Sequence, residues 1–526
     1  MFALALLIGI YSYIIFILGL LGILTKESIV FSSILFLLLS IYYFHKKRED
    51  LPYINLRNKK VRPFLFLFLI LAVINLIGAL APEYSFDALW YHLTLPKIFL
   101  QSGSIYLPPN GIFYYSVMPK LGEMLFTPFV AFNLEVFAKL TQWAFGILTS
   151  IVIYKISRRS FNEKKSFLAV LIFYGSLMVA WQSTVAYVDL IRAFFEVMAL
   201  WGFLVWREKK DIKILMEAGI FLGLAISTKL LALGSIPVFI LLFLLFVNNR
   251  LFAFKNSFIF ALVAVMSALP WFLVAFMETG SPIYPVLSDV YPKVPFSYFL
   301  SLSNAFNDLF TLFLKADIPI SPLYIIFLPL IIIFYKKLNI ELKILSVYFF
   351  ASLLIWYFIP RTGGGRFILP YLPVASVLCI GLISQVKSEA IKKYSYALII
   401  LVFISTIFYR GIANARYIPV IFGFESKDEF LARKLNFNFG DFYDTDGFFR
   451  ENISKDDNVL LFGFHNLYYV NFPFIHESYA KAGDKFNFIA VQDTKLPVRY
   501  NNWKLIYENE ITNVKVYSLD GKLWHY

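Results

Sequence analysis

The sequence predicts an all-α polytopic membrane protein, with about thirteen transmembrane helices, that carries a small C-terminal α/β domain outside the bilayer. Of its 526 residues, 59% are hydrophobic and only 16% are charged, whereas soluble proteins average about 25% charged residues. The apolar runs are long and unbroken, and many approach the ~20 residues that a helix needs to cross a bilayer. The strands of a membrane β-barrel would alternate apolar and polar residues instead.

The candidate spans are the apolar stretches at residues 2–24, 28–45, 63–81, 137–157, 166–183, 190–206, 213–228, 231–248, 257–276, 322–335, 342–359, 367–384 and 394–409. The first stretch lacks a basic start and a small-residue cleavage site, so we interpret it as a retained helix rather than a cleaved signal.

Basic residues follow every even-numbered span, as Arg158-Arg159 follow the fourth and Lys336-Lys337 the tenth. The positive-inside rule places such connectors in the cytoplasm. We therefore expect an integral protein of the inner or plasma membrane, with a cytoplasmic N-terminus and an outward-facing C-terminal domain. The net charge of +14 is explained by these connectors, so it does not indicate nucleic-acid binding.

The chain divides into a transmembrane module at residues 1–410 and a small extracytoplasmic domain at 411–526. In the second part charged residues become more frequent and the apolar runs shorten to strand length. The predicted strands are Val459–Gly463, Phe488–Val491, Trp503–Tyr507 and Val514–Tyr517. Two long outer loops, 82–136 and 277–321, are rich in Pro and aromatic residues, and we expect short helices in them that cap the bundle.

Asp87 is the first candidate for chemistry, because it lies a few residues beyond the third span with Tyr91 and His92 close behind it. A carboxylate at this interface can have a raised pKa and serve as a general base. The alternative is an interfacial belt of aromatic residues around a turn-forming aspartate.

Asp189 follows Tyr187 in a very short outer loop, level with Asp87. A carboxylate there needs a cation, a metal or a substrate as its partner. Arg192 is near enough to be that partner, although it can also pair with Glu196 one helical turn away.

Three cations share the outer face. Lys229 lies in a tight hairpin between two spans, and Arg361 and Arg366 flank three glycines. Glycines allow a close approach of the backbone, and arginine offers a fork of donors to a phosphate. Snorkelling residues at span ends are the alternative. Together with Asp87 and Asp189, these residues describe a site for an anionic lipid head group and a hydroxyl acceptor.

In these features the chain resembles the membrane-embedded GT-C superfamily of glycosyltransferases. It is most similar to the branch of protein mannosyltransferases, aminoarabinose transferases and RgtA/B/C/D-like proteins. The motifs that carry the resemblance are Phe86–Lys97, Ala186–Leu190, Gly223–Lys229, Pro270-Trp271, Gly280–Pro285 and Arg366–Pro370, in this order.

The resemblance implies a GT-C-like fold and transfer of a sugar from a polyprenyl-phosphate donor to a glycan, lipid or protein acceptor, in contact with membrane lipids. Asp87 matches the family's base for a single inverting displacement. Lys229, Arg361 and Arg366 would bind the donor phosphate. The substrate-binding candidates are Tyr91, His92, Lys97, Tyr187 and Asp189.

No cofactor is certain, although the resemblance allows a divalent cation, Mg or Mn, on Asp189. Many protein mannosyltransferases have an Asp-Glu pair in the first loop, whereas Ala88 follows Asp87 here. This difference favours a glycolipid or a cell-envelope polysaccharide as the acceptor over a protein.

Two other interpretations remain open, one from another class and one from the same chemical class. A transporter or flippase of lipid-linked saccharides predicts ionisable residues in the middle of spans, whereas here they lie at span ends, with Glu196 as the exception. An enzyme similar to O-antigen ligases or polymerases would perform the same chemistry with a larger donor.

Overall fold

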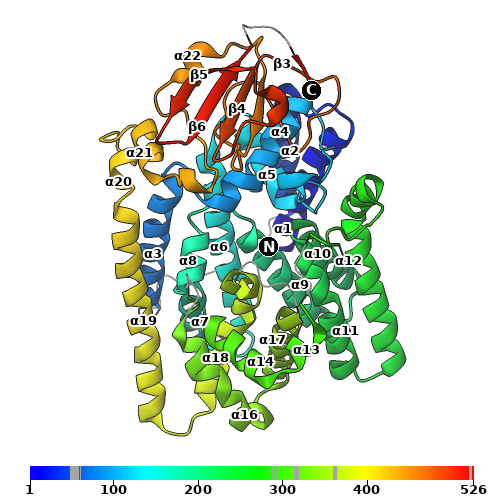
Figure 1. Cartoon of the computed structure of the whole chain (residues 1–526). Coiled ribbons are helices and arrows are strands. Elements are labelled where there is room, and N and C mark those ends of the chain that lie inside the picture. The colour runs from blue at the N-terminus through cyan, green and yellow to red at the C-terminus, as the bar shows by residue number, and fades with distance from the viewer. Residues whose placement is uncertain are drawn as a thin grey trace.

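Helices form one bundle, and a small sheet domain covers one end of it (Figure 1). The computed structural model describes residues 1–47, 59, 61–286, 288–290, 294–312, 319–358, 364–519 and 524–526. This arrangement confirms the predicted fold class, a helical membrane protein with a small C-terminal domain that contains a sheet.

Within the described residues, 8 helices are long and apolar enough to cross a membrane, so the expected number of about thirteen is not confirmed. Their bounds are α1 (Phe2–Leu20), α2 (Lys26–Lys47), α3 (Arg62–Leu80), α6 (Glu135–Ser157), α12 (Arg250–Thr279), α17 (Ile340–Phe358), α18 (Leu372–Gln385), which extends the 3-10 helix η7 (Gly364–Tyr371), and α19 (Glu389–Ala415).

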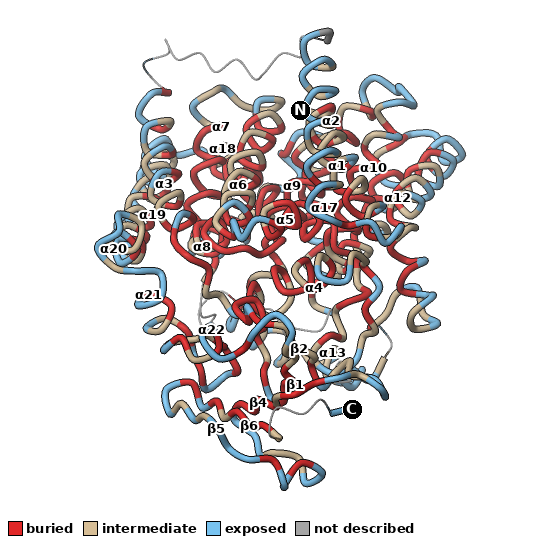
Figure 2. The backbone as a smooth tube through the Cα atoms, turned by 90° about the horizontal axis from the view of Figure 1, so that it is seen from above, coloured by how far each residue is buried: buried red, intermediate tan, exposed pale blue. Residues whose placement is uncertain are grey.

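The other predicted spans are helical but short, broken or charged. They correspond to α7 (Glu163–Tyr174) with α8 (Leu177–Gln182), α9 (Asp189–Lys209), α10 (Ile212–Thr228), η3 (Leu230–Gly234) with α11 (Ser235–Phe246), and α15 (Pro322–Phe327) with η5 (Leu328–Leu330), α16 (Ile331–Phe334) and η6 (Tyr335–Lys337). Pro329 lacks a backbone N–H and interrupts the last of these segments. Helix α9 lies buried in the centre of the bundle (Figure 2), where it can carry paired charges that lipid would not tolerate.

Short helices occur in both long loops, as predicted. The first loop contains the π-helical turn η1 (Ala88–His92), α4 (Thr94–Ser102), the 3-10 turn η2 (Gly111–Phe113) and α5 (Leu121–Val130), and the second contains α13 (Phe296–Leu300) and α14 (Leu302–Phe310).

The C-terminal domain is built on a five-stranded sheet of order β2-β1-β4-β6-β5, beside a two-stranded β3-β7 sheet. Its elements are α20 (Ile418–Ile421), α21 (Lys427–Lys434), η8 (Phe437–Phe439), α22 (Phe448–Asn452), β1 (Val459–Phe462), β2 (Phe474–His476), β3 (Lys485–Phe486), β4 (Phe488–Gln492), η9 (Val498–Tyr500), β5 (Lys504–Asn509), β6 (Val514–Ser518) and β7 (Trp524–His525). Strand β1 is parallel to β2 and β4, whereas β6 is antiparallel to β4 and β5.

Strands β1, β4, β5 and β6 coincide with the four predicted runs, and the short β2, β3 and β7 were not predicted. The domain boundary at residue 411 stays a prediction, since α19 continues to Ala415.

The sheet domain packs directly on the first outer loop. One apolar cluster contains Ile105 and Phe113 of that loop together with Phe464 and Leu467 of the domain. The Tyr469 hydroxyl donates a hydrogen bond of 2.6 Å to the backbone carbonyl of Glu83. The domain therefore holds the loop that begins the candidate site.

Candidate active site

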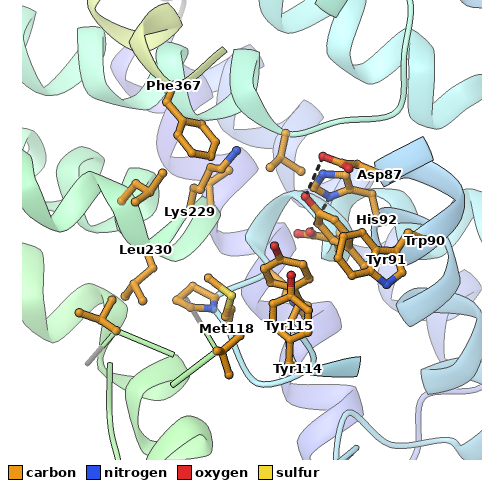
Figure 3. A pocket seen from close by; sticks show the side chains of 18 of the residues that line it. Asp87, Trp90, Tyr91, His92, Tyr114, Tyr115, Met118, Lys229, Leu230 and Phe367 are labelled. Atoms are coloured by element: carbon orange, nitrogen blue, oxygen red, sulfur yellow. Dashed lines mark hydrogen bonds and ion pairs between the residues drawn. The ribbon is translucent and has the colours of Figure 1, made fainter. Parts of the chain in front are cut away.

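A cavity of about 690 Å³ lies between the first outer loop, which provides Asp87 and Glu123, and the residues around Lys229 and Arg366. Its polar and aromatic lining consists of Asp87, Trp90, Tyr91, His92, Tyr114, Tyr115, Lys120, Glu123, Lys229 and Arg366. Figure 3 shows Lys229, Leu230 and Phe367 on one side of the cavity and Asp87, Trp90 and Tyr91 on the other. Further apolar lining comes from Leu231, Val286 and Val290.

The charged residues are brought to this place by the ends of helices. Asp87 precedes η1, Asp189 is the first residue of α9, Lys229 follows the last residue of α10, and Arg366 lies in η7 before α18. An aspartate in the first turn of α9 also interacts favourably with the helix dipole.

These four residues form one alternating ion network. The Arg366 Nη1 atom lies 2.6 Å from Oδ2 of Asp87, and its Nε atom lies 3.6 Å from Oδ2 of Asp189. The Lys229 Nζ atom lies 2.7 Å from Oδ1 of Asp189. The Asp189 side chain is only 1% exposed, so its charge depends on these two cations.

Aromatic rings support the network. The Arg366 guanidinium lies 4.9 Å above the ring of Tyr187, and Lys229 Nζ lies 4.8 Å from the ring centre of Phe367. The Tyr91 hydroxyl donates a hydrogen bond of 3.3 Å to Asp87, and the Asp87 backbone N–H donates one of 3.3 Å to the Tyr187 hydroxyl. Tyr187 therefore contacts the site from behind rather than lining the cavity.

Electrostatics at Asp87 differ from the expectation of a raised pKa. Burial raises the pKa of Asp87, but the positive charge of Arg366, with smaller contributions from His92 and Lys229, outweighs burial and holds this pKa below its ordinary value. The reason is that Arg366, 279 residues away in the chain, bonds directly to this carboxylate. Asp87 is therefore ionised at neutral pH.

A second polar cluster lines the same cavity and was not predicted as a unit. The His92 Nδ1 atom lies 2.8 Å from Oε1 of Glu123, and both side chains are almost fully buried. Lys120 precedes the helix that carries Glu123, and burial lowers the pKa of Lys120 to about 8. The sequence signal that could have indicated this cluster is the occurrence of Lys120 and Glu123 at the start of an otherwise apolar stretch.

Among the predicted site residues, Asp189 belongs to the ion network without lining the cavity, and Lys97 lies apart from both. The Lys97 ammonium donates hydrogen bonds to the backbone carbonyls of Tyr468 at 2.6 Å and Val470 at 2.5 Å, so it binds the sheet domain and does not line the cavity. Arg361 falls outside the described residues, so its role at the donor phosphate stays a prediction.

The aromatic side of the cavity, a wall that Trp90, Tyr114 and Tyr115 form, contacts the sheet domain. The Trp90 indole N–H donates a hydrogen bond of 3.0 Å to the backbone carbonyl of Ile112. The ring of His465, from the sheet domain, lies 4.9 Å from that of Phe86 and 4.6 Å from that of Trp90. This wall is therefore fixed from both sides.

The residues around Asp189 do not fit a divalent cation. Its two oxygens face the positively charged side chains of Lys229 and Arg366. A divalent cation such as Mg²⁺ needs several oxygen ligands around it, and two cationic side chains would repel it. In the described ranges no group of three or more His, Cys, Asp or Glu residues could hold a metal.

Comparison with known proteins gives a family match over part of the chain and a fold. Residues 124–274 match the family model of dolichyl-phosphate-mannose-protein mannosyltransferases. No curated protein sequence matches the chain significantly.

Two crystal structures of ArnT from Cupriavidus metallidurans share the fold. The form bound to undecaprenyl phosphate has a TM-score of 0.53 and 13% identity, and the apo form has 0.52 and 12%. Each match covers 87% of this chain and 98% of the other. The oligosaccharyltransferase AglB from Archaeoglobus fulgidus, in complex with an inhibitory peptide and a dolichol-phosphate, is less similar, with a TM-score of 0.47, 13% identity, and coverage of 88% of this chain and 74% of that chain. The family model matches part of the chain, and the two ArnT structures show that the chain has the same fold as these proteins.

Proposed function

We propose that the protein transfers a sugar from a polyprenyl-phosphate donor to an acceptor hydroxyl at the outer membrane face, with inversion at the anomeric carbon. The alternating network of Asp87, Arg366, Asp189 and Lys229 at one cavity is the observation that carries this proposal. Its two cations line the cavity and suit a lipid phosphate, and Asp87, the carboxylate of the network that lines the cavity, suits a hydroxyl group.

The donor would bind along the side of the cavity formed by Lys229, Leu230 and Phe367. Apolar residues there suit a polyprenyl chain, and Lys229, Arg366 and Lys120 suit its phosphate. These cations oppose the negative charge that develops as the phosphate leaves. The undecaprenyl phosphate bound to the ArnT structure of the same fold supports this donor class.

The acceptor hydroxyl would bind at Asp87, whose carboxylate is ionised and can accept its proton. The acceptor oxygen forms a bond to the anomeric carbon while the bond from that carbon to the phosphate oxygen breaks, and the electron pair leaves with the lipid phosphate. One displacement of this kind inverts the configuration. The wall of Trp90, Tyr114 and Tyr115 supports an acceptor with sugar rings, such as a glycolipid or a cell-envelope polysaccharide.

The orientation in the membrane belongs to the same proposal. We assign the sheet domain and the cavity to the outer face and the N-terminus to the cytoplasm. Support comes from the basic connectors at the opposite end of the bundle, where Arg159 pairs with Glu341 at 2.7 Å and also with Glu208.

The test is Asp87→Asn in proteoliposomes that contain a radiolabelled polyprenyl-phosphate sugar and cell-envelope extract as the source of acceptors. Loss of a general base typically reduces the rate by about 10²–10⁴-fold. We expect a loss of this size with unchanged affinity for undecaprenyl phosphate, whereas Asp456→Asn, at an exposed position of the sheet domain, keeps full activity. Wild-type transfer by Asp87→Asn would contradict the role of Asp87. Movement of the donor across the bilayer without acceptor would instead support a flippase.

A further inference from the structure

The pair formed by His92 and Glu123 has a feature that the network around Arg366 does not explain. His92 is 2% exposed and the Glu123 side chain 3%, and both line the cavity. Among the described residues, neither the His92 Nε2 atom nor the Glu123 Oε2 atom has a hydrogen-bond partner. The imidazole is thus held at one nitrogen by Glu123, while its other nitrogen has no assigned partner.

Within the part of the chain that the structure describes, the buried pair of Arg192 and Glu196 also leaves atoms without partners, but His92 and Glu123 differ from it because both line the cavity. A buried polar atom without a partner costs about 1–3 kcal/mol, and the pair of His92 and Glu123 leaves two of them. Pairs that only stabilise a fold are usually satisfied throughout. A histidine oriented by a carboxylate, with its second nitrogen open, is instead the arrangement that enzymes use to accept protons.

The chemistry at Asp87 creates a need for such a group. Because Arg366 lies 2.6 Å from its carboxylate, Asp87 is a weak base that cannot keep a proton at neutral pH. The proton of the acceptor hydroxyl must therefore move on. His92 is the last residue of η1, which Asp87 precedes, and its charge interacts with that of the aspartate. His465 of the sheet domain also interacts with Asp87, but its Nδ1 atom is bonded to Asn466 and no carboxylate of the described residues orients it.

On the basis of the proposed function, we infer that His92, oriented by Glu123, takes the acceptor proton onward from Asp87. The acceptor O–H bond breaks as the glycosidic bond forms, and the lipid phosphate leaves with the electron pair of the broken bond. The proton passes from Asp87 to the Nε2 atom of His92. The resulting imidazolium is paired with the Glu123 carboxylate until the proton returns to water. His92 and Glu123 are positioning residues in this scheme, since they act through Asp87.

The charged and titratable groups that surround His92, from α5, η1, α9 and the segment before α9, are Glu123, Asp87, Tyr91, Asp189 and Tyr187. Lys120 and Arg366 interact with the carboxylates of this set. Of these residue types, imidazole is the one that ordinarily changes its charge between pH 5 and 8, and Lys120, whose pKa burial lowers to about 8, titrates only at the upper end of this range. A requirement for neutral His92 therefore predicts that transfer declines as the pH falls from 8 to 5.

The experiment is the pH profile of transfer in the proteoliposome assay, at saturating donor, for the wild type and three variants. His92→Gln should lose about 10²–10⁴-fold in rate and should also lose the decline between pH 8 and 5. Glu123→Gln removes a negative charge that favours the imidazolium, so its decline should move to lower pH while its maximal rate falls at least about tenfold. Glu123→Asp retains the charge and should keep the decline close to its wild-type position.

Glu341→Gln is the matched control, because Glu341 also pairs with a cation but lies at the opposite end of the bundle. Its profile should match that of the wild type. If the transfer rate of Glu123→Gln declined over the same pH range as that of the wild type, the relay would be overturned. A wild-type transfer rate that does not change between pH 8 and 5 would also overturn it, and this measurement needs no variant. Retained activity in Asp87→Asn would instead refute the proposed function, so the two failures can be told apart.

Discussion

Single residues decide the electrostatics of this site, and Arg366 is the most important of them. Its guanidinium contacts both Asp87 and Asp189, so removing it takes a cationic partner from each of these carboxylates. Removing one partner of a buried ion pair commonly costs about 3–5 kcal/mol. We expect Arg366→Ala to lower the thermal stability clearly and to weaken binding of undecaprenyl phosphate, as measured by thermal shift with and without this lipid.

Arg366→Lys is the informative companion to that variant. Lysine keeps the charge but lacks the fork of donors that reaches two carboxylates. It should recover part of the stability and little of the transfer activity. Complete recovery would mean that Arg366 supplies only charge.

The lowered pKa of Asp87 gives a prediction about stability and pH. A carboxyl group whose pKa is depressed in the fold stabilises the protein above its unfolded pKa of about 3.9, and this contribution is lost as the pH falls through the folded value. The difference in melting temperature between the wild type and Asp87→Asn should therefore be constant from pH 5 to 8 and should shrink below about pH 4. A difference that changes between pH 5 and 7 would contradict the ionised state of Asp87.

At the scale of elements, the break between α7 and α8 shows how packing changes a predicted span. A Cβ atom at Gly175 would lie 2.4 Å from the ring of Phe403 and 2.7 Å from the carbonyl of Leu171. Gly175→Ala should therefore destabilise the bundle by about 1–3 kcal/mol, measured by thermal unfolding in detergent. Gly411→Ala on α19 is the control, because the nearest atom there is 3.9 Å away. Equal effects of both changes would contradict this account.

Apolar periodicity and length predicted the helical segments and the four main strands, because both signals are local. They did not predict which helices are long enough to span, because several expected stretches, such as 166–183 and 322–335, break into shorter helices in the structure. Helix α9 can carry Arg192 and Glu196 since they pair with each other at 3.4 Å inside the bundle. Asp87 and Arg366 were placed on one face from the sequence, but their direct bond was not, and this bond reversed the expected pKa shift of Asp87. The partners of Lys97 and Glu123 could not be predicted, because Tyr468 and His92 are far from them in the sequence and come close only in the folded chain.

At the scale of the whole molecule, Lys97 joins the first outer loop to the sheet domain, and the site begins on that loop. Its ammonium reaches Tyr468, Val470 and the Asn471 side chain, the last at 3.3 Å. Lys97→Met keeps the length of the side chain but removes these donors. We expect faster hydrogen exchange in residues 463–471 and reduced transfer, because the neighbouring Tyr469 and His465 contact the segment that carries Asp87.

The control for this effect is Lys495→Met, an exposed position of the same domain. If Lys97 acted on the donor directly, Lys97→Met would weaken binding of undecaprenyl phosphate without changing hydrogen exchange at the interface. If the sheet domain positions the loop, exchange at the interface rises and transfer falls together, while the affinity for undecaprenyl phosphate stays close to that of the wild type. The second result is expected, because the Lys97 ammonium is already bound by three oxygen atoms of the domain. The sheet domain would then be part of the catalytic unit, through the loop that it holds in place.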